Sequence, residues 1–302
     1  MTPPAIAIKV DVDTHIGTRD GVPRLLEIFA SFGIRATFYF SMGPDNSGKA
    51  IRRVFTRKGF LKKMLRTGAP STYGLRTLLY GTLLPAPMIA SSFPDVLRKT
   101  AEMGHETGIH CWDHVRWHDL LPKMSKEMVA AELGRADALY REIFGQPALS
   151  TAAPGWTVSA DSLALQDGME LRYCSDSRGR FPFYPVVAGR RYKTLQLPTT
   201  LPTMDELLGT GGITTDSIND HYCALIRPGL NVHTIHAEME GMKLDQVFID
   251  LLRRLRSINA RFVTLAEASE EAEQARPPDC LLAMGELPGR AGLVAMQGAV
   301  QE

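Results

Sequence analysis

Hydrophobic residues along the chain follow two periods, one typical of buried strands and one typical of amphipathic helices. Short runs rich in β-branched and aromatic residues predict eight strands. They are AIAIKVDVD from residue 5, RATFYFS from 35, HETGIH from 105, ALSTAA from 148, LRYCSDS from 171, TLQLPTT from 194, NVHTIHAE from 231 and RFVTL from 261.

The segments between these strands carry the helical period of about 3.6 residues. Helices are predicted at Val22–Phe32, Pro94–Met103, Ser159–Gln166, Asp216–Ile226 and Leu244–Ile258. The longest helix is predicted between Ser125, a favourable N-cap, and Gly145, which suits the position after a C-terminus. Alternating strands and helices form βαβ units, and this number of strands suits an α/β barrel better than an open sheet. Such barrels place their active sites at the C-terminal ends of the strands.

Two segments depart from this alternation. The first is an insertion over residues 46–94, after the second strand, which has no acidic residue and mixes basic with aliphatic and aromatic residues. The mixture suits an anionic lipid surface or a lipid phosphate as well as it suits a helical excursion packed on the barrel, and a nucleic-acid contact is a weaker alternative. The basic residues expected to meet the membrane or the lipid phosphate are Arg52, Arg53, Lys62, Lys63 and Arg66. The second is the Gly- and Pro-rich tail, residues 276–302, predicted as a surface arm or a partly disordered segment after a single domain over residues 1–275.

Composition restricts the class of protein. The chain has 302 residues, of which 44% are hydrophobic and 22% charged, as is typical of a globular protein. A formal charge of +1 argues against a general nucleic-acid binder. Four scattered cysteines without a CxxC pair favour a reduced, intracellular setting. Neither a signal peptide nor a run of about 18 apolar residues is evident, so we expect a cytosolic or peripheral protein of undefined oligomeric state.

The pentapeptide HCWDH places His110 and His114 four residues apart. A helical zinc protease motif needs a glutamate after its first histidine, which is absent here. Glu106 does follow His105, but the next histidine is five positions further on. Because Pro122 and polar residues follow, we predict a loop at the mouth of the barrel. An isolated HxxxH pair is a weak signal on its own.

The DVD segment at the end of the first strand strengthens that signal. Asp11 and Asp13 are two residues apart and therefore point to the same side of the strand. Two buried carboxylates repel each other, so a cation is expected beside them. One aspartate and two histidines can hold a divalent metal with open positions, while the other aspartate acts as a base. Alternatively, the aspartates cap the next helix or pair with Arg19 or Arg24.

Several motifs resemble the polysaccharide deacetylases, which are metal-dependent de-N-acylases of amino sugars with a distorted (β/α) barrel. The resemblance runs from about Ala5 to Thr264 and depends on VDVDT, GHETGIHCWDH, TAAPGW, SDSRGRFPF and VHTIHAE. The longer segments DVDTHIGTRDGVPRLLEI and LPTTLPTMDELLG resemble one branch, the deformylases of undecaprenyl-phosphate-linked 4-deoxy-4-formamido-L-arabinose. That branch implies a step in lipid A modification and polymyxin resistance, at the cytoplasmic face of the inner membrane.

The resemblance also implies roles for individual residues. Asp11 is expected as the catalytic base, His236 as the general acid and Asp176 as the carboxylate that tunes the site. Asp176 could do so by holding His236 in place, although a simple salt bridge with Arg178 or Arg180 is the alternative. The implied metal ligands are Asp13, His110 and His114, with zinc favoured over cobalt, manganese or iron.

The sequence departs from the family at Ala152, where an arginine usually pairs with the catalytic aspartate; Arg178 and Arg19 are the candidate replacements. Both are also expected to contact the substrate. Glu238 and Glu240 follow His236 with a period of two and are expected to bind sugar hydroxyls or to act as cap residues. Trp156 is expected either to stack on the sugar or to pack in the core.

Two other functions remain open at this point. One is a de-N-acetylase or amidohydrolase with a soluble substrate, such as an acetylated amino sugar or a cyclic ureide. The other is a barrel that binds carbohydrate or lipid without catalysis, for which Ala152 is the supporting residue.

Overall fold

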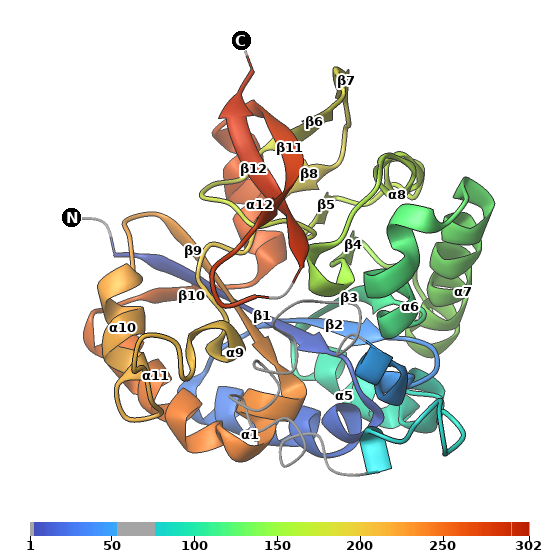
Figure 1. Cartoon of the computed structure of the whole chain (residues 1–302). Coiled ribbons are helices and arrows are strands. Elements are labelled where there is room, and N and C mark those ends of the chain that lie inside the picture. The colour runs from blue at the N-terminus through green and yellow to red at the C-terminus, as the bar shows by residue number, and fades with distance from the viewer. Residues whose placement is uncertain (1–2, 53–75, 291, 302) are drawn as a thin grey trace.

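The computed structural model describes residues 3–52, 76–290 and 292–301 (Figure 1). Among these residues, the main sheet is entirely parallel and has eight strands, each overlapping one of the predicted segments. They are β1 Ala5–Val12, β2 Thr37–Ser41, β3 Glu106–Cys111, β4 Ser150–Thr151, β5 Tyr173–Cys174, β8 Leu195–Gln196, β9 Leu230–His236 and β10 Arg261–Val263.

The strands follow one another around a distorted barrel. The order is β9-β1-β2-β3-β4-β5-β8, and β10 pairs with the first half of β1. The backbone N–H groups of Thr200 and Leu201, after β8, donate to Val232 O of β9 at 3.1 Å each, which brings the curved sheet round toward its start. The predicted α/β barrel is confirmed.

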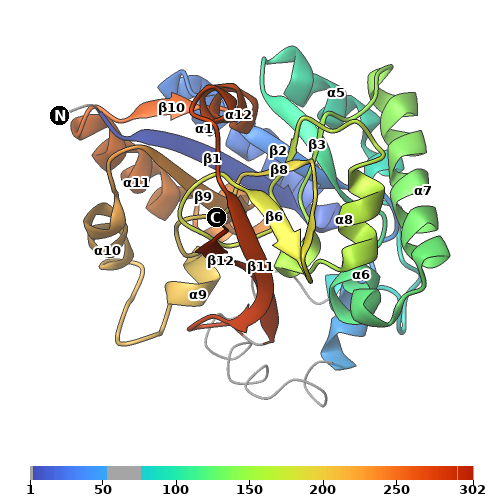
Figure 2. The same cartoon turned by 90° about the horizontal axis from the view of Figure 1, so that it is seen from above.

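Helices surround the strands (Figure 2). They are α1 Val22–Phe32, α5 Pro94–Glu102, α6 His114–Leu120, α7 Lys126–Phe144, α8 Ala160–Gln166, α9 Met204–Leu207, α10 Ile218–Leu225, α11 Asp245–Ser257 and α12 Leu265–Gln274. Short 3-10 or π turns are η1 Gly17–Gly21, η2 Ser47–Arg52, η3 Ala90–Ser92, η4 Leu121–Lys123, η5 Pro154–Trp156 and η6 Met239–Lys243. The predicted caps of α7 are confirmed: Ser125 accepts from Met128 N, and Gly145 adopts a left-handed conformation with φ 71°. The predicted loop after His110 was wrong, because α6 begins at His114.

Strand β1 separates two apolar clusters. Ile6, Ile8, Val10 and Val12 contribute to the larger cluster, which also contains the buried faces of α1 and α11. Ala5 and Ala7, on the opposite side of the strand, belong to a smaller cluster inside the curved sheet. Because side chains alternate along a strand, the polar residues Lys9 and Asp11 continue the inner row toward the C-terminal end of β1.

The C-terminal residues form part of a second sheet, in the order β12-β11-β6-β7. Its strands are β6 Tyr184–Val187, β7 Arg190–Arg191, β11 Asp279–Glu286 and β12 Leu293–Val300. Strands β11 and β12 form an antiparallel hairpin at the top of Figure 1. The alternative of a partly disordered tail was wrong, because β11 pairs with β6 and buries Cys280 and Leu282. Exposed residues of the hairpin, such as Leu281 and Leu293, leave the surface-arm alternative open. The domain boundary at residue 275 stays a prediction.

Much of the basic insertion lies outside the described residues. Arg53, Lys62, Lys63 and Arg66 belong to that part, and the side chain of Arg52 is likewise not described. Within residues 3–52, 76–290 and 292–301, no helix is both long enough and apolar enough to span a membrane.

Candidate metal and catalytic site

The C-terminal ends of β1, β3 and β9 bring together the central residues of the predicted site. Asp11 lies near the end of β1, and Asp13 follows the strand directly. His110 lies near the end of β3, and His236 is the last residue of β9. His236 is also the register partner of Asp11, so these two side chains lie on the same side of adjacent strands.

His114 is positioned by the start of helix α6. The N-cap residue Asp113 has extended backbone angles, and its Oδ1 accepts from Arg116 N at 2.9 Å. Its Oδ2 accepts from Asn46 Nδ2 at 2.7 Å, which ties the helix start to the segment after β2. Asp113 therefore fixes the first turn of the helix, where His114 lies.

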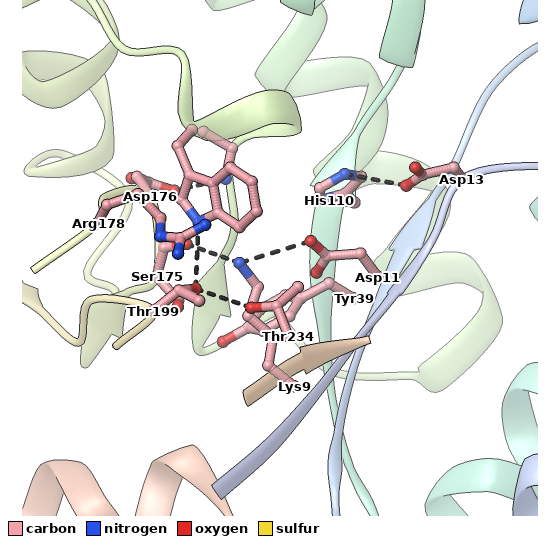
Figure 3. A network of polar contacts seen from close by, with 12 residues as sticks. Lys9, Asp11, Asp13, Tyr39, His110, Ser175, Asp176, Arg178, Thr199 and Thr234 are labelled. Atoms are coloured by element: carbon pink, nitrogen blue, oxygen red, sulfur yellow. Dashed lines mark hydrogen bonds and ion pairs between the residues drawn. The ribbon is translucent and has the colours of Figure 1, made fainter. Parts of the chain in front are cut away.

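Asp13, His110 and His114 form a compact group of potential metal ligands. Nε2 of His110 lies 3.1 Å from Asp13 Oδ1 (Figure 3), and Nε2 of His114 lies 3.3 Å from Asp13 Oδ2. One ligand atom from each residue lies within 4.8 Å of the other two. Metal–ligand bonds of about 2.0–2.2 Å at tetrahedral or octahedral angles separate two ligand atoms by about 2.8–3.6 Å. The observed distances therefore fit three ligands of one ion.

The charge state of Asp13 agrees with that role. Although burial opposes ionisation, His114 and His110 lower the pKa of Asp13, and His236 acts in the same direction. The carboxylate is therefore ionised, as a metal ligand must be.

Asp176 is fully buried, but its position differs from the prediction. It accepts from Ala153 N at 2.7 Å and from Gln166 Nε2 at 2.8 Å. Gln196 Nε2 contributes a longer contact of 3.4 Å. Burial raises the pKa of Asp176, and these donors oppose the shift. None of these contacts involves His236, so the expectation that Asp176 holds this histidine was wrong.

The residues expected to bind sugar hydroxyls beyond His236 are buried within the protein. Strand β9 ends at His236, so the chain turns away and the period of two is lost. Glu238 and Glu240 have no exposed surface, and Glu240 Oε2 accepts from the backbone N–H of His236 at 2.8 Å. Burial raises the pKa of Glu240 to about 7. The expected contacts of both glutamates with sugar hydroxyls stay a prediction.

Trp156 and Arg178 are also packed inside the protein. The Trp156 side chain is buried, and its Nε1 donates to Thr199 Oγ1 at 3.1 Å. The guanidinium of Arg178 lies 4.7 Å from the centre of the Trp156 ring and forms an ion pair with Glu206. For the indole, the packing alternative is the one that the structure supports. The expected contact of Arg178 with the substrate stays a prediction.

Neither arginine suggested as the partner of Asp11 occupies that position. Arg19 is exposed and pairs with its neighbour Asp20, and Arg178 pairs with Glu206. The contact is made by Lys9, whose Nζ lies 3.6 Å from Asp11 Oδ2. Sequence reasoning missed this residue, although Lys9 precedes Asp11 by two residues and therefore lies on the same side of β1.

Comparison with known proteins identifies the class. The family model described as polysaccharide deacetylase matches residues 2–174. The chain therefore belongs to the polysaccharide deacetylase family. A protein of Shewanella sediminis is 38% identical over 296 residues, which cover 98% of this chain and 95% of that protein. Its name is probable 4-deoxy-4-formamido-L-arabinose-phosphoundecaprenol deformylase ArnD. A Wigglesworthia glossinidia brevipalpis protein of the same name is 33% identical over 285 residues, covering 93% and 98%.

Solved structures agree on the fold. The crystal structure of a probable polysaccharide deacetylase from Pseudomonas aeruginosa PAO1 matches with a TM-score of 0.63 and 13% identity, covering 90% of this chain and 92% of that chain. An allantoinase structure matches equally well, with a TM-score of 0.63 and 14% identity over 90% and 91% of the two chains. At such identities the likeness shows the barrel alone.

Proposed function

We propose that this chain is a metal-dependent amide hydrolase that removes the formyl group from 4-deoxy-4-formamido-L-arabinose linked to undecaprenyl phosphate. The observation that carries the proposal is the group of Asp13, His110 and His114 with Asp11 and His236 beside it. The two curated deformylase relatives, similar over nearly the whole chain, support this substrate over a soluble amino sugar. The reaction would serve lipid A modification with aminoarabinose and so resistance to polymyxin.

The ligand group suits one divalent ion. Two imidazoles and a carboxylate favour zinc, and they also accept cobalt, manganese or iron. Such an ion lowers the pKa of a water molecule and polarises the formyl oxygen.

The protein's own groups move the protons. Asp11 accepts a proton from the attacking water as its oxygen bonds to the formyl carbon. A backbone N–H near the site shares the negative charge that develops on the formyl oxygen. Protonated His236 then donates to the sugar nitrogen as the carbon–nitrogen bond breaks, which yields formate and the free amine.

The test combines metal analysis of the purified protein with turnover of the lipid-linked formamido sugar. We expect about one divalent ion per chain, loss of the ion in Asp13→Asn, and retained ion with turnover lowered at least about 100-fold in Asp11→Asn and His236→Ala. Near-native turnover by Asp11→Asn or His236→Ala would contradict the assigned roles.

Substrate comparison separates the alternatives. Faster turnover of an acetylated or water-soluble amino sugar would favour a de-N-acetylase or another amidohydrolase. A protein that binds the lipid-linked sugar but never hydrolyses it would be a binding barrel.

We also propose that the insertion over residues 46–94 holds the protein at the cytoplasmic face of the inner membrane. Its composition supports this, because basic residues attract anionic headgroups while neighbouring apolar residues enter the interface. The test is cosedimentation with vesicles containing phosphatidylglycerol at low salt. The triple variant Lys62→Gln/Lys63→Gln/Arg66→Gln should bind less. Equal binding by this variant and the wild type would contradict the proposal.

A further inference from the structure

Lys9 is a completely buried lysine inside the barrel, with none of its surface exposed. Moving an ammonium group out of water costs several kcal/mol unless other charges and dipoles replace the lost hydration. Its Nζ donates to Ser175 O at 2.9 Å and lies 3.6 Å from Asp11 Oδ2 (Figure 3). A backbone carbonyl of the segment after β5 and a carboxylate of β1 therefore solvate the ammonium directly.

Two aromatic rings and a second carboxylate complete this environment. Nζ lies 5.5 Å from the centre of the Trp156 ring and 5.7 Å from that of Tyr39, within the range of cation–π attraction. Burial lowers the pKa of Lys9, whereas the charges of Asp11 and Asp176 oppose that shift. An uncharged side chain of similar shape would receive no electrostatic stabilisation from these acidic and aromatic neighbours.

The position of Lys9 along β1 relates it to the reaction. It precedes Asp11 by two residues, so Lys9 and Asp11 lie in one row on the inner side of the sheet, and Asp13 follows directly after the end of β1. Asp11 therefore lies between a fixed cation and the group of potential metal ligands. Its Oδ2 faces Lys9, while its Oδ1 is buried and has no hydrogen-bond partner among the described residues.

From this arrangement we propose that Lys9 is a positioning residue for the hydrolysis: its ammonium fixes Oδ2 of Asp11, so that Oδ1 is left to accept the proton of the attacking water. The inference rests on the proposed function and assigns a role to a residue outside the ligand group. Within the described part of the chain, Lys9 forms the ion pair of Asp11. Ala152 cannot supply a charge, and Arg19 and Arg178 are paired elsewhere.

The test uses the full-length, metal-loaded protein and the lipid-linked formamido sugar. Lys9→Met keeps the length of the side chain but removes its charge, and we expect kcat to fall about 10–100-fold, as when other groups that orient a reactive side chain are lost. KM should stay within about twofold and the metal content should be unchanged, because Lys9 touches neither the substrate nor the ligands. Lys9→Arg restores the charge and should recover most of kcat. Lys126→Met, on the exposed start of α7, is the matched control and should leave kcat unchanged.

A second uncharged variant keeps the proposal testable if Lys9→Met does not fold. Lys9→Gln can still donate to Ser175 O, and it should show the same fall in kcat. Near-native kcat in a folded, metal-loaded Lys9→Met or Lys9→Gln overturns the role of Lys9 and leaves the proposed function intact. An equal loss in Lys9→Arg and Lys9→Met overturns it as well, because the charge is then irrelevant. Absence of turnover by the wild type overturns the proposed function itself, and with it this role of Lys9.

Discussion

A buried ion cluster connects the barrel to the C-terminal hairpin, and its removal provides a sharp test of how the molecule is held together. Nη1 of Arg178 lies 2.9 and 3.0 Å from the two carboxylate oxygens of Glu206, and its Nη2 donates to Leu201 O at 3.0 Å. Arg290, between β11 and β12, reaches the same carboxylate at 3.3 Å. Both guanidinium groups also lie against Trp156, at 4.7 and 4.4 Å from its ring centre.

Glu206→Gln preserves the shape of the side chain and removes its charge. The side chains of Arg178 and Glu206 are only 6% and 2% exposed, so water cannot replace the lost carboxylate. Breaking a buried ion pair from one side costs about 3–5 kcal/mol, because the remaining charge stays uncompensated. We expect the free energy of unfolding to fall by about this amount. The glutamine can still accept from Thr203 N, so loss of the helix cap does not explain the effect.

Urea unfolding followed by tryptophan fluorescence measures the change. The matched control is Glu270→Gln, which removes the same charge from an exposed pair with Arg172 at 3.4 Å. Exposed pairs contribute about 0–1 kcal/mol, so the control should unfold nearly as the wild type does. The reasoning is refuted if Glu206→Gln is destabilised no more than Glu270→Gln.

Three further predictions concern local contacts. Burial lowers the pKa of His105 to about 4, so the unfolded chain binds a proton at a higher pH than the folded chain does. The free energy of unfolding should therefore fall by at most about 3 kcal/mol as the pH drops from about 6.5 to about 4. Urea unfolding should show a flatter pH profile for His105→Gln. Gly108→Ala would place a methyl group 2.6 Å from Tyr39 Cε1, so a loss of about 1–3 kcal/mol is expected in urea unfolding, and an unchanged midpoint would contradict the packing. Asp113→Ala removes the acceptor for Arg116 N, which should lower the free energy of unfolding by about 1 kcal/mol. It should also weaken metal binding about 10-fold in a competition titration. Unchanged metal affinity would show that the N-cap does not position His114.

The strands and most helices were predictable because their signals are local. Buried strands read as short apolar runs, and α7 carries both caps in its own sequence. Helix α6 was missed because Pro122 and its polar neighbours suggested a loop, although Asp113 is a favourable N-cap. Pro122 instead lies in the 3-10 turn η4, which follows the helix. The second sheet was missed because β6 pairs with β11, about 95 residues further along, and such pairings leave no local pattern.

The residues of the site were predictable, but several of their partners were not. A period of two shows which side of a strand a residue occupies, whereas the curvature of the sheet decides which residues meet on that side. Asp176 was therefore placed on the correct side of the sheet but assigned the wrong partner. Its carboxylate accepts hydrogen bonds from Gln166 and Gln196, and not from His236.

The ion pair between Lys9 and Asp11 explains how the site can have an alanine, and not an arginine, at position 152. This alanine is fully buried in the cluster that contains Tyr39, and the ammonium of Lys9 lies 5.7 Å from the centre of the Tyr39 ring. A buried arginine at position 152 would bring a second cation to a region where Lys9 already pairs with Asp11. Two cations around one carboxylate would repel each other with little water to screen them. The ion pair with Lys9 therefore gives Asp11 a cation that Ala152 cannot supply.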